Sequence, residues 1–129
     1  MKMQPVVHFE MPAEDNDRAS KFYADVFGWQ MQTMGEEYGG YLMAMTTEST
    51  EKGPVKPGAI NGGFFKKPAG QNPAPHLVLA VDNLEQSIKA VKEAGGEVLG
   101  EPMDIPNIGL FIMFKDTEGN QVGMLQPTP

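Results

Sequence analysis

The sequence predicts an α+β fold made of two similar halves, each with a strand, a helix and three further strands. Three observations predict it: matching polar pairs open two helical patterns, an apolar strand-like segment precedes each helix, and strand patterns follow each helix. The distance in sequence from Asp15-Asn16 to Asp82-Asn83, the polar pairs, equals the distance from Gly28 to Gly95, the helix-ending glycines. We therefore expect one domain, residues 1–129, built from a duplicated βαβββ module.

Both helices are predicted from an apolar stripe with helical spacing, which a helix buries against a core. The first stripe consists of Ala19, Phe22, Tyr23, Val26 and Phe27, and the second of Leu84, Ile88, Val91 and Ala94. Asn83 followed by Gln86 resembles a capping box, with asparagine as the N-cap. We expect the first stripe to lie in the core and Trp29 to pack where the helix meets the next strand.

The strands are predicted from short apolar or alternating runs. The first strand of each half spans residues 5–11 and 75–81, and each contains one of the two histidines of the chain, His8 and His76. The later strands are expected at residues 29–34, 38–46 and 59–66 in the first half, and at 97–99, 108–115 and 120–126 in the second. The segment 116–120 (DTEGN) has the composition of a hairpin turn.

Two segments have the composition of loops. Residues 47–58, with two prolines and alternating charges, predict an exposed loop, and residues 67–75, rich in Pro, Gly and Asn, predict a linker. The first module is thus expected at 5–66 and the second at 76–127. A small sheet covered by one helix still has a second apolar face, so we expect the paired modules to form a curved, partly open mixed sheet around a cavity. Whether modules pair within a chain or between chains stays open.

The composition narrows the function. The chain has no cysteine, which excludes disulfides, thiolate catalysis and cysteine-based metal sites and favours a cytoplasmic location. The net charge of −7 is spread over both halves without a basic patch, so we expect no nucleic-acid partner. No apolar run approaches the ~20 residues of a membrane span, and the start lacks signal-peptide character, so we expect no membrane partner. A small-molecule ligand is the remaining partner class.

Several segments together resemble the glyoxalase / bleomycin resistance protein / dioxygenase (vicinal oxygen chelate, VOC) superfamily. They are His8 with segments 15–23 (DNDRASKFY) and 26–29 (VFGW), then segments 76–83 (HLVLAVDN), 95–98 (GGEV) and 116–120 (DTEGN), where Thr117 replaces a usual proline. The resemblance covers nearly the whole chain. It implies the paired βαβββ fold, a small-molecule ligand and a homodimer. The superfamily includes metal-dependent lyases, isomerases and dioxygenases as well as metal-free drug binders, so the reaction stays open.

In the enzymes of this superfamily, the resemblance implies one metal ligand from each of four strands. His8 and His76 match the two histidine ligands. The third ligand, usually Glu, falls near Asn61 or Gly62, and the fourth falls on Gly123, so both carboxylate positions are replaced. A divalent ion such as Zn, Ni, Mn or Fe that polarises vicinal oxygens needs anionic ligands, and glycine supplies none.

A substitute site would draw on two neighbouring side chains. Glu10 lies two residues beyond His8 and shares its strand face, which also makes it the candidate catalytic base, although an exposed strand residue is its simpler interpretation. Gln121 shares a face with position 123 and offers a carbonyl oxygen. The predicted ligand pocket is lined by His8, Met45, Asn61, His76 and Gln121, since methionine adapts to irregular apolar ligands.

Three functions follow from these observations. The favoured one is a small-molecule binding protein with a degenerate metal site and no certain cofactor. The alternative is a metal-dependent lyase or isomerase of the glyoxalase type, or a dioxygenase, that uses His8 and His76. The third is an interaction module with a vestigial cavity.

Overall fold

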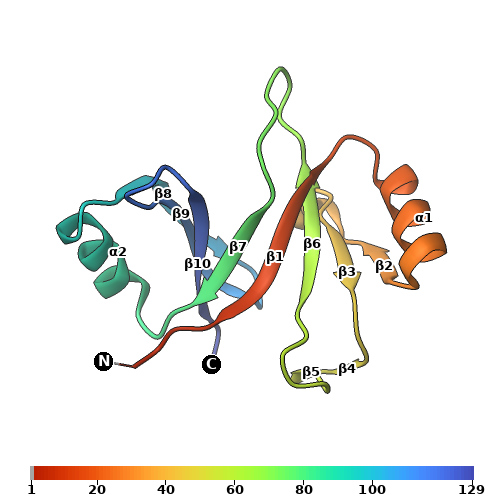
Figure 1. Ribbon diagram of the computed structural model, residues 1–129, viewed down its shortest axis with the longest axis horizontal. Helices are drawn as coiled ribbons and strands as arrows, with labels where there is room; N and C mark the ends of the chain where they lie inside the picture. Colours follow the sequence, from red (N-terminus) through yellow and green to blue (C-terminus); the bar gives the residue numbers. More distant parts are fainter. Residues whose placement is uncertain (1) are drawn as a thin grey trace. The chain divides into compact units, whose positions relative to one another are not determined.

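The structure is a computed structural model that describes residues 2–129, and in it the chain forms two compact units with the same order of elements. The first, here called the first module, spans His8–Pro75. The second module combines His76–Pro129 with residues 2–7. Figure 1 shows a helix and a set of strands in each, which confirms the predicted α+β class with two βαβββ modules.

The first module contains most of β1 (Val6–Ala13), which begins in the second module, and then α1 (Asn16–Phe27), β2 (Gln30–Thr33), a short 3-10 helix (Glu36–Tyr38), β3 (Leu42–Met45), β4 (Ser49–Thr50), β5 (Gly53–Pro54) and β6 (Asn61–Lys66). The second contains β7 (His76–Ala80), α2 (Leu84–Glu93), β8 (Glu97–Ile105), β9 (Gly109–Lys115) and β10 (Gln121–Pro127). Neither helix in this described part of the chain has the length and apolarity of a membrane span.

Strand pairing repeats from one module to the other. In the first module the order is β2-β3-β6-β1, with β1 parallel to β6 and β3 antiparallel to both of its neighbours. In the second the order is β7-β10-β9-β8, with β7 parallel to β10 and β9 antiparallel to both of its neighbours. The first and last strands of each module therefore lie side by side and run parallel. Parallel neighbours need a long connection, which the helix and the other strands of the module provide.

Each helix begins and ends where the sequence predicts. The Asp15 carboxylate accepts a hydrogen bond from the Arg18 backbone N–H at 3.0 Å, and the Asn83 side chain accepts one from the Gln86 N–H at 2.9 Å. Helix α1 ends at Gly28, whose φ of 72° is the left-handed conformation that glycine adopts without strain. The caps satisfy backbone N–H groups that a helix cannot pair internally.

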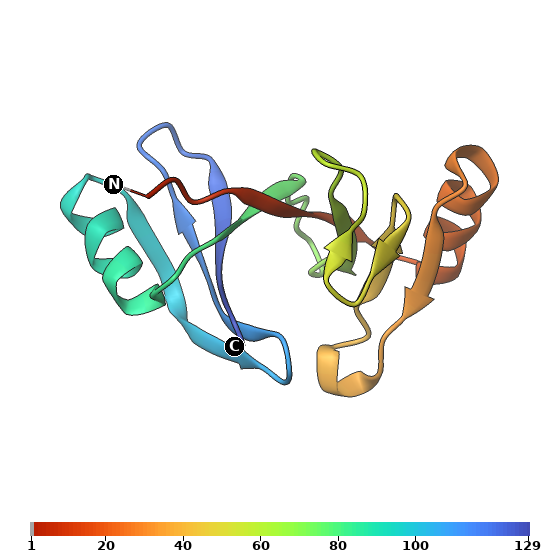
Figure 2. The same cartoon turned by 90° about the horizontal axis from the view of Figure 1, so that it is seen from below.

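Each module has its own apolar core between its sheet and its helix. In the first module the buried residues are Ala13, Leu42, Ala44 and Phe64, and in the second they are Val81, Leu84, Ile112 and Met124. Figure 2 shows α1 beside β2 and α2 along β8, the strands on which these helices pack. Two separate cores explain why the chain divides into two units.

The prediction that the whole first stripe of α1 is buried is wrong. Phe22, Val26 and Phe27 are 53%, 56% and 59% exposed, and the core contacts come from Ala19 and Tyr23. The physical reason is the short strand beside the helix. Strand β2, which α1 contacts most, has only four residues, so it covers only part of the apolar face of α1. Trp29 packs at the helix–strand junction as predicted, with its ring stacked on Tyr23 at a centroid distance of 4.6 Å.

Several strand limits differ from the prediction. Strand β8 runs to Ile105 instead of ending at residue 99, because a register shift between Leu99 and Met103 and a positive φ at Gly100 let the strand continue past Pro102. The predicted strand 38–46 is shorter, since the 3-10 helix occupies its start. The predicted loop 47–58 contains a small hairpin of two strands, β4 and β5, with two residues each. It lies beyond the ends of β3 and β6 in Figure 1.

Candidate functional site

The sheet of the first module has one face toward α1 and one face away from it, here called the helix-distal face. The strand register identifies the residues of this face. His8 lies beside Asn61, Glu10 lies beside Gly63, and Gly63 lies beside Met43. Side chains alternate along a strand, so Met45 shares this face as well. The predicted residues His8, Glu10, Met45 and Asn61 therefore lie on one surface.

Tyr41, which sequence reasoning missed, connects the polar residues of this face. The His8 Nε2 atom and the Tyr41 hydroxyl are 2.9 Å apart, and the same hydroxyl hydrogen-bonds to Glu10. Burial, followed by the charge of Glu10 and its hydrogen bond, raises the pKa of Tyr41 far above its ordinary value of about 10. The phenol is therefore neutral under physiological conditions.

These contacts fix the direction of the hydrogen bonds. A neutral phenol has one proton, and an ionised carboxylate only accepts. Tyr41 therefore donates to Glu10, and the Nε2–H of His8 donates to the Tyr41 oxygen. This assigns the His8 tautomer from its network. In this tautomer Nε2 has no lone pair for a metal, and only Nδ1 could bind one.

Gly63 is required because the Tyr41 ring lies across it. A Cβ built at Gly63 would collide with the ring carbons and the hydroxyl of Tyr41. Gly63 is buried, and close approach of a ring to the backbone is a common reason for glycine within a strand. The alternation of Tyr41, Met43 and Met45 opposite a strand glycine is the sequence signal that would have identified Tyr41.

Asn61 uses its side-chain amide within the protein. Its Oδ1 accepts from the Thr46 backbone N–H at 2.9 Å, and its Nδ2 donates to the Ser49 hydroxyl at 2.8 Å. The amide thus ties β6 to the loop after β3. Met45 and this loop line a pocket of about 410 Å³ together with Gly28, Gln30, Thr46, Thr47, Glu48 and Ser49.

The second module has a corresponding arrangement at its parallel strand pair. Gly123 pairs with Val78, and the same register continued by two residues places Gln121 beside His76. His76 is half-buried and Gln121 is exposed. The pairs His8–Asn61 and His76–Gln121 are therefore equivalent, and so are Gly63 and Gly123.

Gly123 is covered by a ring as Gly63 is. A Cβ at Gly123 would lie 2.7 Å from the Phe111 ring, closer than real side chains approach, and 3.3 Å from the Val78 methyl group. The equivalence also identifies Gly63, one or two residues beyond the expected positions near Asn61 or Gly62, as the counterpart of Gly123. Gly123, where the family resemblance places the fourth ligand, and Gly63, its equivalent in the first module, thus both lie beneath an aromatic ring.

The donor set does not fit the divalent metal that the resemblance implies. Within residues 2–129, no three His, Asp or Glu side chains are grouped in a way that could hold an ion. In the first module His8 donates its Nε2–H to Tyr41, and Glu10 accepts from the same hydroxyl. Hard divalent ions need anionic or lone-pair donors directed at one point, and the glycines offer none.

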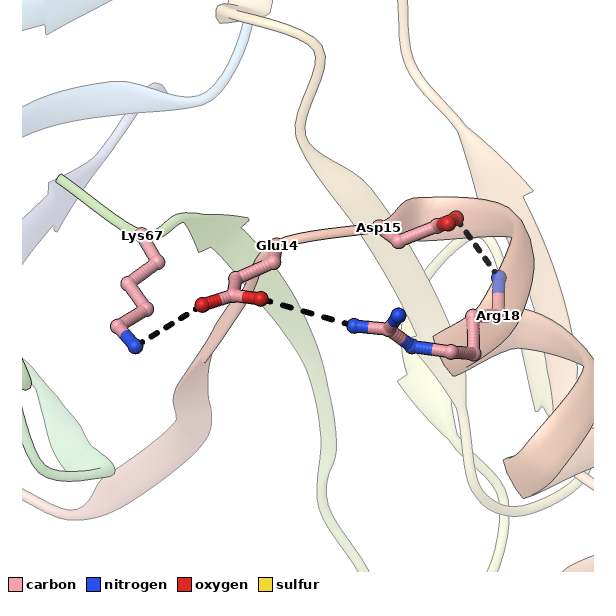
Figure 3. A network of polar contacts seen from close by, with 4 residues as sticks. All are labelled: Glu14, Asp15, Arg18 and Lys67. Carbon is pink, nitrogen blue, oxygen red and sulfur yellow. Dashed lines mark hydrogen bonds and ion pairs between the residues drawn. The ribbon is translucent and has the colours of Figure 1, made fainter. Parts of the chain in front are cut away.

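A second polar cluster lies where β1 ends and α1 begins (Figure 3). Glu14 bonds to Lys67 at 3.1 Å and to Arg18 at 3.7 Å, while Asp15 caps the helix. The hydrogen bond and charge of Lys67, with a smaller effect of Arg18, lower the pKa of the exposed Glu14 carboxyl. The Glu14 and Arg18 side chains are mostly exposed and Lys67 is partly buried, so the cluster joins β1, α1 and the end of β6 through ion pairs of small net stability.

Known proteins match the chain over most of its length. A family model described as the Glyoxalase/Bleomycin resistance protein/Dioxygenase superfamily matches residues 6–124. A glyoxylase-like domain-containing protein from Didymella fabae is 34% identical over 113 residues, which cover 86% of this chain and 84% of that protein. A putative glyoxylase, CFP32, from Mycobacterium tuberculosis is 29% identical over 121 residues, and the chain spans only 43% of its length.

The fold is found in solved structures. Methylmalonyl-CoA epimerase from Mycobacterium tuberculosis superposes with a TM-score of 0.68 at 15% identity, over 96% of this chain and 88% of that one. An identity that low shows the fold alone. The match to the family model, together with the paired βαβββ modules, shows that the chain belongs to the glyoxalase / bleomycin resistance protein / dioxygenase superfamily.

Proposed function

We propose that this chain is a small-molecule binding protein that works without a divalent metal. One observation carries the proposal: Gly123, where a carboxylate was expected, and the equivalent Gly63 are covered by the rings of Phe111 and Tyr41. A carboxylate side chain at either glycine would require its ring to move. The methionines on the helix-distal face, Met43 and Met45, supply apolar and adaptable surface for a ligand.

The pocket prediction is part of this proposal. His8 and Met45 stay in it as side chains of the helix-distal face, while His76 and Gln121 are proposed from their equivalent position in the second module. Asn61 is proposed as a support for the pocket wall, because both ends of its amide bond to the loop.

Metal analysis of the purified protein tests the proposal. We expect less than a tenth of an equivalent of Zn, Ni, Mn or Fe, and a melting temperature that neither EDTA nor added divalent ions change, since a bound metal would stabilise the folded state by mass action. Stoichiometric metal that disappears in the His8→Ala/His76→Ala double variant would refute it.

That result would favour the alternative, a metal-dependent lyase or isomerase. The glyoxylase names of the relatives and the two retained histidines support this alternative. It requires unconventional ligands, with Glu10, two residues from His8 along β1, as the candidate carboxylate.

We further propose a homodimer located in the cytoplasm. The dimer rests on the family resemblance, and the location rests on the lack of cysteine. Light scattering during size-exclusion chromatography tests the first. A molar mass twice that of the single chain is expected, and the mass of one chain would refute the dimer.

A further inference from the structure

The pocket of about 410 Å³ that Met45 and the following loop line carries charge of one sign. Among the described residues that line it, Glu48 is the only charged one. Within residues 2–129, no Lys, Arg or His forms an ion pair with the Glu48 carboxylate. The pocket therefore holds an acidic group whose charge no side chain of this part of the chain neutralises by contact.

The end of helix α1 adds partial negative charge at the same place. Gly28, which ends α1, also lines the pocket. The carboxyl end of a helix carries about half a negative charge, and cations are stabilising beside it. The last turn of α1 contains no basic residue, and its acidic residue, Asp25, pairs with Lys21 at 2.7 Å. The helix end therefore favours the same ligand charge as Glu48 does.

The hydroxyl groups of two lining residues have their protons engaged within the protein. Thr46 donates to the Ile60 carbonyl at 2.6 Å, and Ser49 donates to the Thr47 carbonyl at 3.0 Å. A hydroxyl whose proton is engaged offers a ligand only its lone pairs. These two hydroxyl oxygens can therefore accept hydrogen bonds from a ligand, and they have no proton left to donate.

An alkylammonium group matches this environment. An ammonium has three N–H donors, no acceptor and a full positive charge, whereas a carboxylate has only acceptors and a negative charge. The half-buried Met45 gives the pocket an apolar wall for an aliphatic chain. The volume of the pocket lies within the range of about 300–1,000 Å³ that is typical of small-molecule sites.

We infer that this pocket binds the protonated amino group of a small aliphatic amine, with Glu48 as its counter-ion and Met45 in contact with its chain. The hydroxyl oxygens of Thr46 and Ser49 accept from the remaining N–H groups. This inference deepens the proposed function and rests on it, because it names a ligand class for the part of the site that Met45 lines. It assigns Glu48 the selection of ligand charge.

Four matched probes test the inference: pentylammonium, pentyltrimethylammonium, 1-pentanol and pentanoate. They share one aliphatic chain, and they differ in charge and in N–H donors. Titrations at neutral pH and low ionic strength, followed by protein NMR, should show pentylammonium binding about five-fold more tightly than each of the others, with shifts at residues 46–49. Binding of another probe that is as tight or tighter, no saturable binding of pentylammonium, or shifts confined to other residues would each overturn the inference.

Two substitutions of one residue assign the preference to the pocket. Glu48→Gln keeps the size and removes the charge, so pentylammonium should bind within about two-fold of 1-pentanol. Glu48→Lys reverses the charge, so pentanoate should bind more tightly than pentylammonium.

The matched control is Glu51→Gln, which lies between β4 and β5 and outside the pocket lining, and it should keep the wild-type order of affinities. A wild-type order that persists in both Glu48 variants, or an equal loss of preference in Glu51→Gln, would overturn the inference. Circular dichroism of each variant checks that it folds.

Metal analysis and titrations in EDTA separate this inference from the proposed function. A low metal content together with no preference for pentylammonium would sink the inference and leave the proposed function standing. Pentylammonium binding that is lost in EDTA and restored by Zn would sink both.

Discussion

At the scale of single residues, the ring of Tyr41 and the missing side chain of Gly63 depend on each other. A methyl group at Gly63 would collide with the ring, so Gly63→Ala should displace Tyr41 and break its bond to His8. We expect a loss of about 1–3 kcal/mol in the free energy of unfolding, the usual cost of overpacking. Urea unfolding measures it.

A double-mutant cycle tests this dependence. With Tyr41→Ala already present, the further change Gly63→Ala should cost less than about 0.5 kcal/mol, because the colliding ring is gone. Gly35→Ala is the control, since a Cβ there would meet only the flexible Glu37 side chain at 3.3 Å. Additive effects of Tyr41→Ala and Gly63→Ala would contradict the dependence.

The same residues show how much of the site could be predicted. The sequence placed the side chains of His8, Glu10 and Met45 on one surface, because the alternation of side chains along a strand follows from neighbouring positions alone. It identified Gly123 and left the first-module counterpart of Gly123 undecided between Asn61 and Gly62, because strand register is not local. Alternation with Met43 and Met45 could have placed Tyr41 on the same face, but its contacts with His8 and Glu10 depend on the path of the loop that contains Gly39 and Gly40.

At the scale of elements, helix α1 shows the limit of pattern reading. Its apolar stripe predicts a helix correctly, but the stripe is wider than the sheet that supports it. Tyr23 contacts Trp29 at 4.6 Å and Phe64 at 5.3 Å between ring centroids, whereas the adjacent Phe22 is 53% exposed. The pattern alone could not distinguish these two neighbours, because the length of β2 decides which of them is covered.

This difference leads to a prediction for neighbouring aromatic residues. Tyr23→Ala should lower the free energy of unfolding by about 3–5 kcal/mol, as other large-to-small core changes do. Phe22→Ala should cost only about 1 kcal/mol, the value of its edge contacts with Tyr23 and Phe27. Urea unfolding of both variants checks it, and equal losses would show that α1 is covered on both sides in solution.

The turn before β10 carries a pH-dependent stability contribution. The Asp116 carboxylate accepts from the Asn120 side chain at 2.9 Å, from the Asn120 backbone at 2.9 Å and from the Glu118 backbone at 2.8 Å. These bonds, led by those from Asn120, lower the pKa of Asp116 in the folded state. The folded state therefore binds fewer protons at this group than the unfolded state does.

The sign of the effect follows directly. The contribution of Asp116 is complete above the unfolded aspartate pKa of about 3.9 and is lost as pH falls through the lower folded value. The stability difference between the wild type and Asp116→Asn should be constant above about pH 5 and shrink toward pH 3. Urea unfolding over this range measures it, and a difference that does not vary with pH would contradict the assignment.

At the scale of the whole molecule, the two modules are not two consecutive stretches of chain. Residues 2–7 belong to the second module, where the Ala80 N–H donates to the Pro5 carbonyl at 3.0 Å and Lys2 pairs with Asp82 at 3.1 Å. The sequence repeat predicted a first module beginning at residue 5. The repeat reveals which segments are equivalent, but not which core each segment joins, because that depends on contacts between residues far apart in the chain.

The linker provides the last prediction, because each module has its own core. Residues 68–72 are exposed, while Lys67 is held by backbone and side-chain bonds to Ala13 and Glu14. A Gly/Ser insertion between Asn72 and Pro73 that doubles the predicted linker 67–75 should cost only about 0.6 kcal/mol. The same insertion between Gly119 and Asn120 removes the Asp116–Asn120 bonds and should cost more. Urea unfolding of both variants compares them. A larger loss at the linker would show that its length, and not only the two cores, maintains the fold.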